Sequence, residues 1–262
     1  MIQKNLFIAW MVGGAICLCC ACGQDNSRNL DTRKVQWKNS KQLATDKKSP
    51  TCEIDIMIEE AVSPEDVARK VNSQIVSQVF GYDSLDVKVA VDSFANEQNR
   101  LYSQECAGSY AAHPDTDKEW YQYRHYVRAE EKSIYPNIIT YEILIENKKG
   151  TNRKSSLRTF LNFDARNGER INVADMFKPG YEHVVEPLLM RELQKKFNCV
   201  SLAQLNAKGI LCNSRLYVPD NFRPGKNEIK FLFNESEIAP HKTGEITLSI
   251  PRSLLEQVIK FK

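Results

Sequence analysis

The sequence predicts an α+β fold in which helices pack on one side of an antiparallel sheet. Several segments alternate apolar and polar residues with a period of two, as half-buried strands do, and the clearest covers residues 157–163. Other segments repeat apolar residues at helical spacing, for example Val67, Val71, Ile75 and Val79. We expect a smaller strand–helix–helix region to precede the main α+β domain.

The composition is that of a globular chain. Its 262 residues are 42% hydrophobic and 26% charged, enough for one large domain or two small ones. The formal net charge of +3 is too balanced to indicate nucleic-acid binding. No glycine-rich phosphate loop occurs in the sequence. We therefore expect neither a nucleic-acid partner nor a cofactor.

The N-terminus has the features of a bacterial export signal. Lys4 precedes an apolar run at residues 6–18 that ends in small residues and is too short for a permanent transmembrane helix. The sequence LCCACG at residues 18–23 resembles the lipobox of lipoproteins, with small Ala21 before Cys22.

This resemblance implies a signal peptide over residues 1–21 and a lipid on Cys22. More than one acyl chain would then hold the protein on a membrane. Gly23, in place of aspartate, implies the outer membrane of a Gram-negative bacterium, on its periplasmic side or at the cell surface. An uncleaved anchor and a plain secreted protein are the alternatives.

Four cysteines follow the lipobox, and they predict disulfides because the chain is exported. Four cysteines allow three pairings. Cys199 and Cys212 close a short loop and are expected to pair, which leaves Cys52 for Cys106. After the lipobox the sequence has no CxxC spacing, and no histidine stands at ligand spacing from a cysteine. We therefore expect no metal site.

Residues 22–50 are polar and lysine-rich, so we expect a flexible tether there. A companion region follows at residues 51–134. Its expected elements are a strand at 52–61, helices at 63–80 and 85–110, and a strand within 120–134 that is rich in aromatic residues.

Residues 135–262 form the main predicted domain. Strands with alternating apolar residues are joined by turns that contain glycine or proline, and a long amphipathic helix lies between them. The expected elements are strands at 138–146 and 155–163, helices at 181–197 and 201–205, strands at 216–222, 229–233 and 245–250, and a closing helix at 253–261.

The candidate binding residues lie in the aromatic segment and the turn after the next strand. Alternation puts Trp120 and Arg124 on one face of the predicted strand and Tyr123 on the other. Aromatic rings beside arginines can stack on sugars or grip a protein, although the same pattern is typical of a sheet core with a polar outer face. Lys148 and Arg153 flank the neighbouring turn and complete the set.

Two blocks in the second half carry a family resemblance. The first is FLNFD, a glycine, an isoleucine and ADMF within residues 160–177; the second is FLFNESEIAP, GEI and IP within residues 231–251. Together they resemble the extracytoplasmic domain shared by the RsiV anti-sigma factor and PdaC-type peptidoglycan deacetylases. The resemblance implies an α+β fold and a binding role, because the RsiV domain captures lysozyme. We expect neither an anti-sigma role nor deacetylase chemistry.

Nothing in the sequence is typical of a catalytic centre. No HxxxH or HExxH motif occurs, and no serine sits in a nucleophile elbow. Asp164 and Asp175 flank a turn and are expected to stabilise it, as Glu237 near His241 stabilises a corner. We expect a non-enzymatic, lipid-anchored protein that binds a cell-wall glycan or a protein such as lysozyme. The alternatives are a peptidoglycan hydrolase and a structural subunit of an envelope complex.

Overall fold

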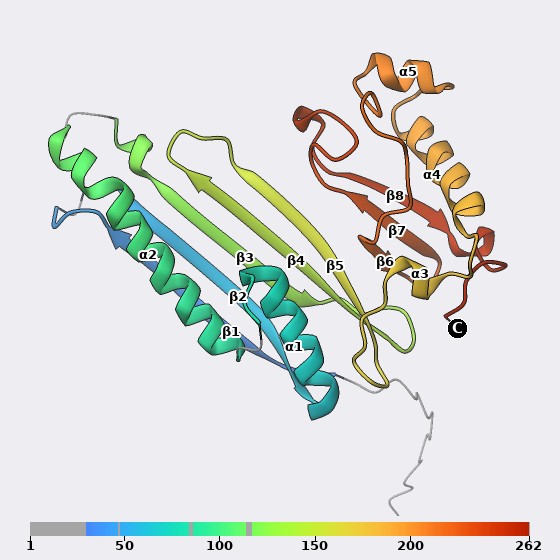
Figure 1. The fold of residues 1–262 in the computed structure, drawn as a ribbon, viewed down its shortest axis with the longest axis horizontal. Coiled ribbons are helices and arrows are strands. Elements are labelled where there is room, and N and C mark those ends of the chain that lie inside the picture. The colour runs from blue at the N-terminus through green and yellow to red at the C-terminus, as the bar shows by residue number, and fades with distance from the viewer. Residues whose placement is uncertain (1–29, 47, 84–85, 114–116, 262) are drawn as a thin grey trace, which may run out of the picture.

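A computed structural model describes residues 30–46, 48–83, 86–113 and 117–261 of the chain. The expected signal peptide and Cys22 lie outside these residues. Figure 1 shows two lobes: a long sheet with two helices across it, and a smaller lobe, coloured orange to red, beyond one edge of that sheet.

The first lobe, residues 31–164, is built on a five-stranded sheet of order β1-β2-β3-β4-β5. Its elements are β1 (Asp31–Gln42), β2 (Thr51–Ser63), α1 (Glu65–Phe80), α2 (Val87–Ala112), the 3₁₀ helix η1 (Lys118–Tyr121), β3 (Tyr123–Glu131), β4 (Ile138–Lys149) and β5 (Ser155–Asp164). Neighbouring strands are antiparallel except β2 and β3. A parallel pair needs a long crossover, which α1 and α2 supply. The α+β class is confirmed, and the one parallel pair makes the sheet mixed.

The helices α1 and α2 cover one face of this sheet (Figure 1). Alternate residues of β2 on that face, Ile54, Ile56 and Ile58, are almost completely buried together with Val71 and Ile75 of α1. Burying one such side chain contributes about 1.5–3 kcal/mol. This shared cluster therefore holds the helices on the sheet.

Strand β1 lies in the segment expected to be a flexible tether, residues 22–50, so that expectation is wrong over residues 31–42. β1 pairs with β2 along its whole length. Trp37 packs against the core, and Lys38 forms an ion pair with Asp55 at 3.3 Å. Because β1 is an edge strand with mostly polar side chains, its alternation is faint in the sequence.

The expected domain boundary at residue 134 is also wrong. β4 and β5 follow it in sequence, yet they pair with β3 in the first sheet. The hydrophobic clusters divide later, since Ala165 belongs to the first cluster and Ile171 to the second. Only Tyr135 and Ile138 join the second cluster from before this point, within the described residues.

The second lobe, residues 171–261, has a three-stranded antiparallel sheet of order β6-β7-β8, with α4 packed on β8. Its elements are α3 (Val173–Met176), α4 (Glu182–Lys196), α5 (Leu202–Ala207), β6 (Phe222–Pro224), β7 (Glu228–Phe233), η2 (His241–Thr243), β8 (Ile246–Pro251) and η3 (Arg252–Leu254). Phe177, Phe222 and Phe231 are fully buried in its core.

Two expected elements of this lobe differ in the structure. The strand predicted at 216–222 is reduced to the three residues of β6. The closing helix predicted at 253–261 is replaced by η3 and turns. The end of the chain instead pairs with α3 and its flank, because Lys260 donates its N–H to the carbonyl of Met176 at 2.9 Å.

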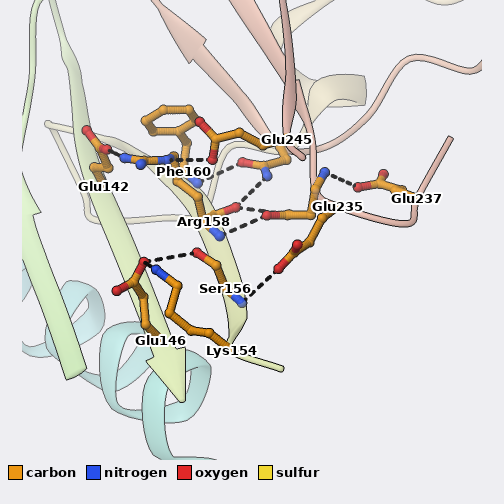
Figure 2. Close-up of polar contacts among 11 residues, drawn as sticks. Glu142, Glu146, Lys154, Ser156, Arg158, Phe160, Glu235, Glu237 and Glu245 are labelled. Carbon is orange, nitrogen blue, oxygen red and sulfur yellow. Dashed lines mark hydrogen bonds and ion pairs between the residues drawn. The ribbon is translucent and has the colours of Figure 1, made fainter. Parts of the chain in front are cut away.

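The second lobe covers the outer edge of β5 (Figure 2). Asn221 accepts a hydrogen bond from the N–H of Phe160 at 2.8 Å and donates one to the carbonyl of Arg158 at 2.8 Å. Asn234 accepts from the N–H of Arg158 at 2.8 Å. These side-chain amides satisfy groups that a neighbouring strand would otherwise satisfy, so this edge of the sheet is closed.

Arg158 adds an ionic link at the same edge. Its guanidinium donates to Glu245 of the second lobe at 3.0 Å and also pairs with Glu142 of β4 (Figure 2). Because the Arg158 side chain is only 28% exposed, water screens these contacts less than it screens contacts of a fully exposed arginine.

The four described cysteines are free thiols, so neither expected disulfide is present in the structure. Cys52 and Cys106 do lie in one core cluster. Burial raises the pKa of the Cys52 thiol to about 12. Cys199 is buried and Cys212 is exposed.

Candidate functional site

Trp120 is displayed at one end of the first sheet, with 60% of its surface exposed. It lies on η1, which begins where Asp117 accepts a hydrogen bond from the N–H of Glu119 at 3.0 Å. The next residue, Tyr121, is buried, and its hydroxyl lies 3.1 Å from that of Ser109 on α2. Tyr121 therefore anchors η1 to the core while Trp120 remains in solvent.

The turn between β4 and β5 packs directly on η1. Gly150 donates its N–H to the carbonyl of Gln122 at 2.8 Å. Its φ is +58°, and a Cβ atom there would lie 2.3 Å from the carbonyl oxygen of Trp120. Only glycine fits both the backbone conformation and the close approach. The sequence predicts this turn, but the contact with Trp120 depends on the strand register that places Tyr123 opposite Lys149.

We call residues 118–121 and 148–154 the hairpin end. It contains five basic side chains and one acidic one, a formal charge of +4 in a chain whose net charge is +3. Lys148 pairs with Glu119 at 3.0 Å, whereas Arg153 is exposed and has no ion-pair partner within the described residues. This ion pair holds η1 against the turn. Lys149 and Lys154 pair with Glu105 and Glu146 just outside the hairpin end, so the positive charge that remains is that of Lys118 and Arg153.

The other two predicted binding residues begin β3 beside this end, with the Lys149 ammonium 5.2 Å from the centre of the Tyr123 ring, but each side chain also has a partner elsewhere. Tyr123 faces α2, where its hydroxyl donates to Glu105 at 3.1 Å and its ring packs on Tyr102. Arg124 lies on the opposite face of the sheet and pairs with Glu53 at 2.8 Å. The strand begins at Tyr123, so the expected alternation does not extend back to Trp120.

Trp120, Lys148 and Arg153 are thus the predicted site residues that lie within the hairpin end. An exposed indole next to basic groups can stack on the flat face of a sugar and attract nearby carboxylates. Lys118 and Lys154 belong to the same end but were not singled out from the sequence. The two segments of the hairpin end are far apart in the sequence, so their proximity can be seen only in the folded structure, where the turn packs on η1.

The residues that carry the family resemblance have structural partners. Asn162 is fully buried and joins the lobes, since it donates to the carbonyl of Phe222 at 2.8 Å. Asp164 accepts from the N–H of Arg166 at 2.9 Å, which confirms its expected role in the turn. Asp175 accepts from the N–H of Asn172 at 3.0 Å in a capping box.

The residues of the second block also have structural partners. Glu237 accepts from the N–H of Asn234 at 2.6 Å and from the hydroxyl of Tyr217. His241 pairs with Glu235 at 3.1 Å rather than with Glu237. Glu237 therefore stabilises the corner, as expected from the sequence, and the motif residues describe the fold more than a binding site.

Two further observations apply to the part of the chain that the structure describes. No group of three or more His, Cys, Asp or Glu side chains there is arranged to hold a metal ion. No helix among these residues is both long and apolar enough to cross a membrane.

Two solved structures share this architecture. A member of the DUF3298 family from Bacteroides fragilis NCTC 9343 is 21% identical with a TM-score of 0.79, over 88% of this chain and 94% of that chain. A DUF3298 family protein from Pseudomonas aeruginosa PAO1 is 14% identical with a TM-score of 0.57, over 89% of this chain and 96% of that chain. At these identities the likeness shows the fold alone.

No curated protein is similar enough to the chain to count as a match. Residues 174–253, most of the second lobe, match the model of a family described as a protein of unknown function, DUF3298. The chain therefore has the fold of solved DUF3298 proteins, and a segment of its second lobe matches the DUF3298 model.

Proposed function

We propose that this protein is a non-catalytic binding protein of the cell envelope and that its hairpin end binds a cell-wall glycan. The observation that carries the proposal is Trp120, a large apolar side chain that is 60% exposed. It lies on η1, which the buried Tyr121 and the turn after β4 hold in place. In the free protein this indole exposes apolar surface to water. Stacking on a sugar ring would bury that surface, which is favourable.

The charge of the hairpin end favours a glycan over a lysozyme as the ligand. Peptidoglycan carries carboxylates, which the basic side chains of the hairpin end without an ion-pair partner among the described residues, Lys118 and Arg153, would attract. A lysozyme with a cationic surface would be repelled at this end. Lysozyme capture remains the function implied by the resemblance to the RsiV domain, so it is the second candidate.

We also propose that a lipid on Cys22 anchors the protein to the outer membrane, with the folded lobes in the periplasm or at the cell surface. The support is the lipobox-like sequence at residues 18–23 and the apolar run before it. Globomycin treatment tests this step, because a blocked lipoprotein signal peptidase would leave the uncleaved precursor to accumulate.

Co-sedimentation of the purified protein with insoluble peptidoglycan tests the binding role. Trp120→Ala should weaken binding at least about tenfold, as truncation of a central interface tryptophan commonly does. Val200→Ala is the matched control, because Val200 is an apolar residue of the second lobe with 84% exposure.

The same assay separates the candidates. Unchanged binding by the Trp120 variant would overturn the assignment to the hairpin end. Saturable binding to a panel of immobilised lysozymes, with none to peptidoglycan, would favour the second candidate. Turnover of muropeptides by the unmodified protein would contradict a purely binding role.

A further inference from the structure

A groove in the second lobe is lined by residues of α4, by Leu202 at the start of α5 and by residues within 211–216. Figure 1 shows α4 and α5 in this lobe. The volume of the groove is about 410 Å³, within the range of about 300–1,000 Å³ that small ligands occupy. The apolar lining comes from Pro187, Met190, Leu202, Leu211 and Leu216. Leu202 is 47% exposed, so part of this lining faces water in the free protein.

The α4 side of the groove carries two carboxylates one helical turn apart. Glu182 and Glu186 both line it, and neither forms an ion pair or a side-chain hydrogen bond with any residue that the structure describes. Glu192, two turns further along α4, is paired with Lys195 at 3.8 Å. The groove therefore presents negative charge that the folded chain leaves unneutralised.

Pro187 interrupts the backbone hydrogen bonding of α4 at the same wall. It lies inside α4 and has no N–H, so the carbonyl of His183 lacks the donor that helical geometry would place four residues later. His183 and Pro187 both line the groove. The two carboxylates of this wall match the N–H donors of an ammonium group.

The other wall carries a positive group. Arg215 lines the groove from the segment after α5, and it has no ion-pair partner among residues 30–46, 48–83, 86–113 and 117–261. Its planar guanidinium suits a carboxylate, which it can bind through two parallel hydrogen bonds. The groove thus has an acidic wall, a basic wall and an apolar lining between them.

We propose that this groove binds a short peptide that carries an ammonium group, a free carboxylate and small apolar side chains. The ammonium group lies between Glu182 and Glu186, the carboxylate pairs with Arg215, and the apolar side chains cover Met190 and Leu202. The groove and the hairpin end lie in different lobes, so this proposal and the glycan proposal can fail independently.

Methyl NMR of the purified protein, labelled with ¹³C at the methionine methyl groups, tests this proposal. Met190 lines the groove, whereas the buried Met57 and Met176 lie elsewhere and serve as internal references. The probe is the tripeptide Lys-Ala-Ala with free termini. We expect a saturable shift of the Met190 methyl signal alone, with a Kd of about 1 mM or tighter.

Charge variants identify the two walls. Glu182→Gln with Glu186→Gln should weaken binding about tenfold or more, because both carboxylates are removed without loss of volume. Glu192→Gln on the same helix is the matched control and should leave the Kd unchanged. Arg215→Gln should bind the free peptide and its C-terminal amide equally, whereas the unmodified protein should prefer the free carboxylate.

Three results would overturn the proposal. The first is no Met190 shift at a peptide concentration of about 10 mM, ten times the weakest Kd expected. The second is equal binding of a peptide whose two amines are acetylated. The third is an equal Kd for the glutamine double variant and the unmodified protein.

Discussion

Asn162 offers the sharpest test of how the two lobes are held together. It lies on β5 in the first lobe and is fully buried. Its amide donates to the carbonyl of Phe222 in the second lobe at 2.8 Å, and its oxygen accepts from the hydroxyl of Thr140 at 2.9 Å. Asn162→Ala removes both bonds and leaves two buried polar groups without their partner.

The expected loss of stability follows from those two groups. A typical intramolecular hydrogen bond contributes about 0.5–1.5 kcal/mol net, and a buried acceptor left unsatisfied costs about 1–3 kcal/mol. We therefore expect Asn162→Ala to lower the free energy of unfolding by about 2–4 kcal/mol. Asn152→Ala, in the exposed turn after β4, should change it by less than about 0.5 kcal/mol.

Urea unfolding followed by two probes measures both the loss and its location. The described tryptophans, Trp37 and Trp120, belong to the first lobe, whereas circular dichroism reports helices and strands of both lobes. The two transitions should coincide in the unmodified protein and separate in the variant, because the link between the lobes is weakened. A loss below about 0.5 kcal/mol, within the range of ordinary surface substitutions, would refute the reasoning.

Two further predictions concern the first lobe. Gly150→Ala should lower the free energy of unfolding by about 1–3 kcal/mol in the same urea assay. Alanine disfavours the positive φ, and its Cβ would meet the carbonyl of Trp120. An unchanged free energy of unfolding would show that η1 and the turn can separate freely. Burial lowers the pKa of His125, so below the unfolded value of about 6.5 the unfolded chain binds a proton that the folded chain resists. Stability is therefore complete above that pH and should fall as the pH drops below it, and His125→Gln should flatten this slope between about pH 6.5 and 5 in chemical denaturation at fixed pH; an unchanged slope would assign the effect to other groups.

The sequence is most informative where one side of an element is buried. The alternation of Ile54, Ile56 and Ile58 predicts β2 because those side chains meet the helices. It fails for β1, whose exposed edge position requires few apolar residues. Strand pairing is likewise not visible locally, so the sequence predicts β4 and β5 in the second domain although their partner β3 lies in the first lobe.

The hairpin end was only partly predictable for the same reason. Trp120, Lys148 and Arg153 were singled out by residue type, and the register of β3 with β4 brings them together. Tyr123 and Arg124 were included through an alternation that starts later than the sequence suggests, since η1 interrupts it. Residue type therefore predicts the region around the hairpin end, while the backbone geometry determines which side chains face solvent there.

The motif residues invite a different conclusion about where function resides. Asn162, Asp164, Asn234 and Glu237 all bind backbone groups at turns or at the contact between the lobes. Such residues are required for the architecture whatever the ligand is, so a motif made of them carries information about fold and little about binding. Ligand specificity should then reside in side chains that the fold leaves unpartnered, which is why Trp120 and the groove beside α4 are the places to test.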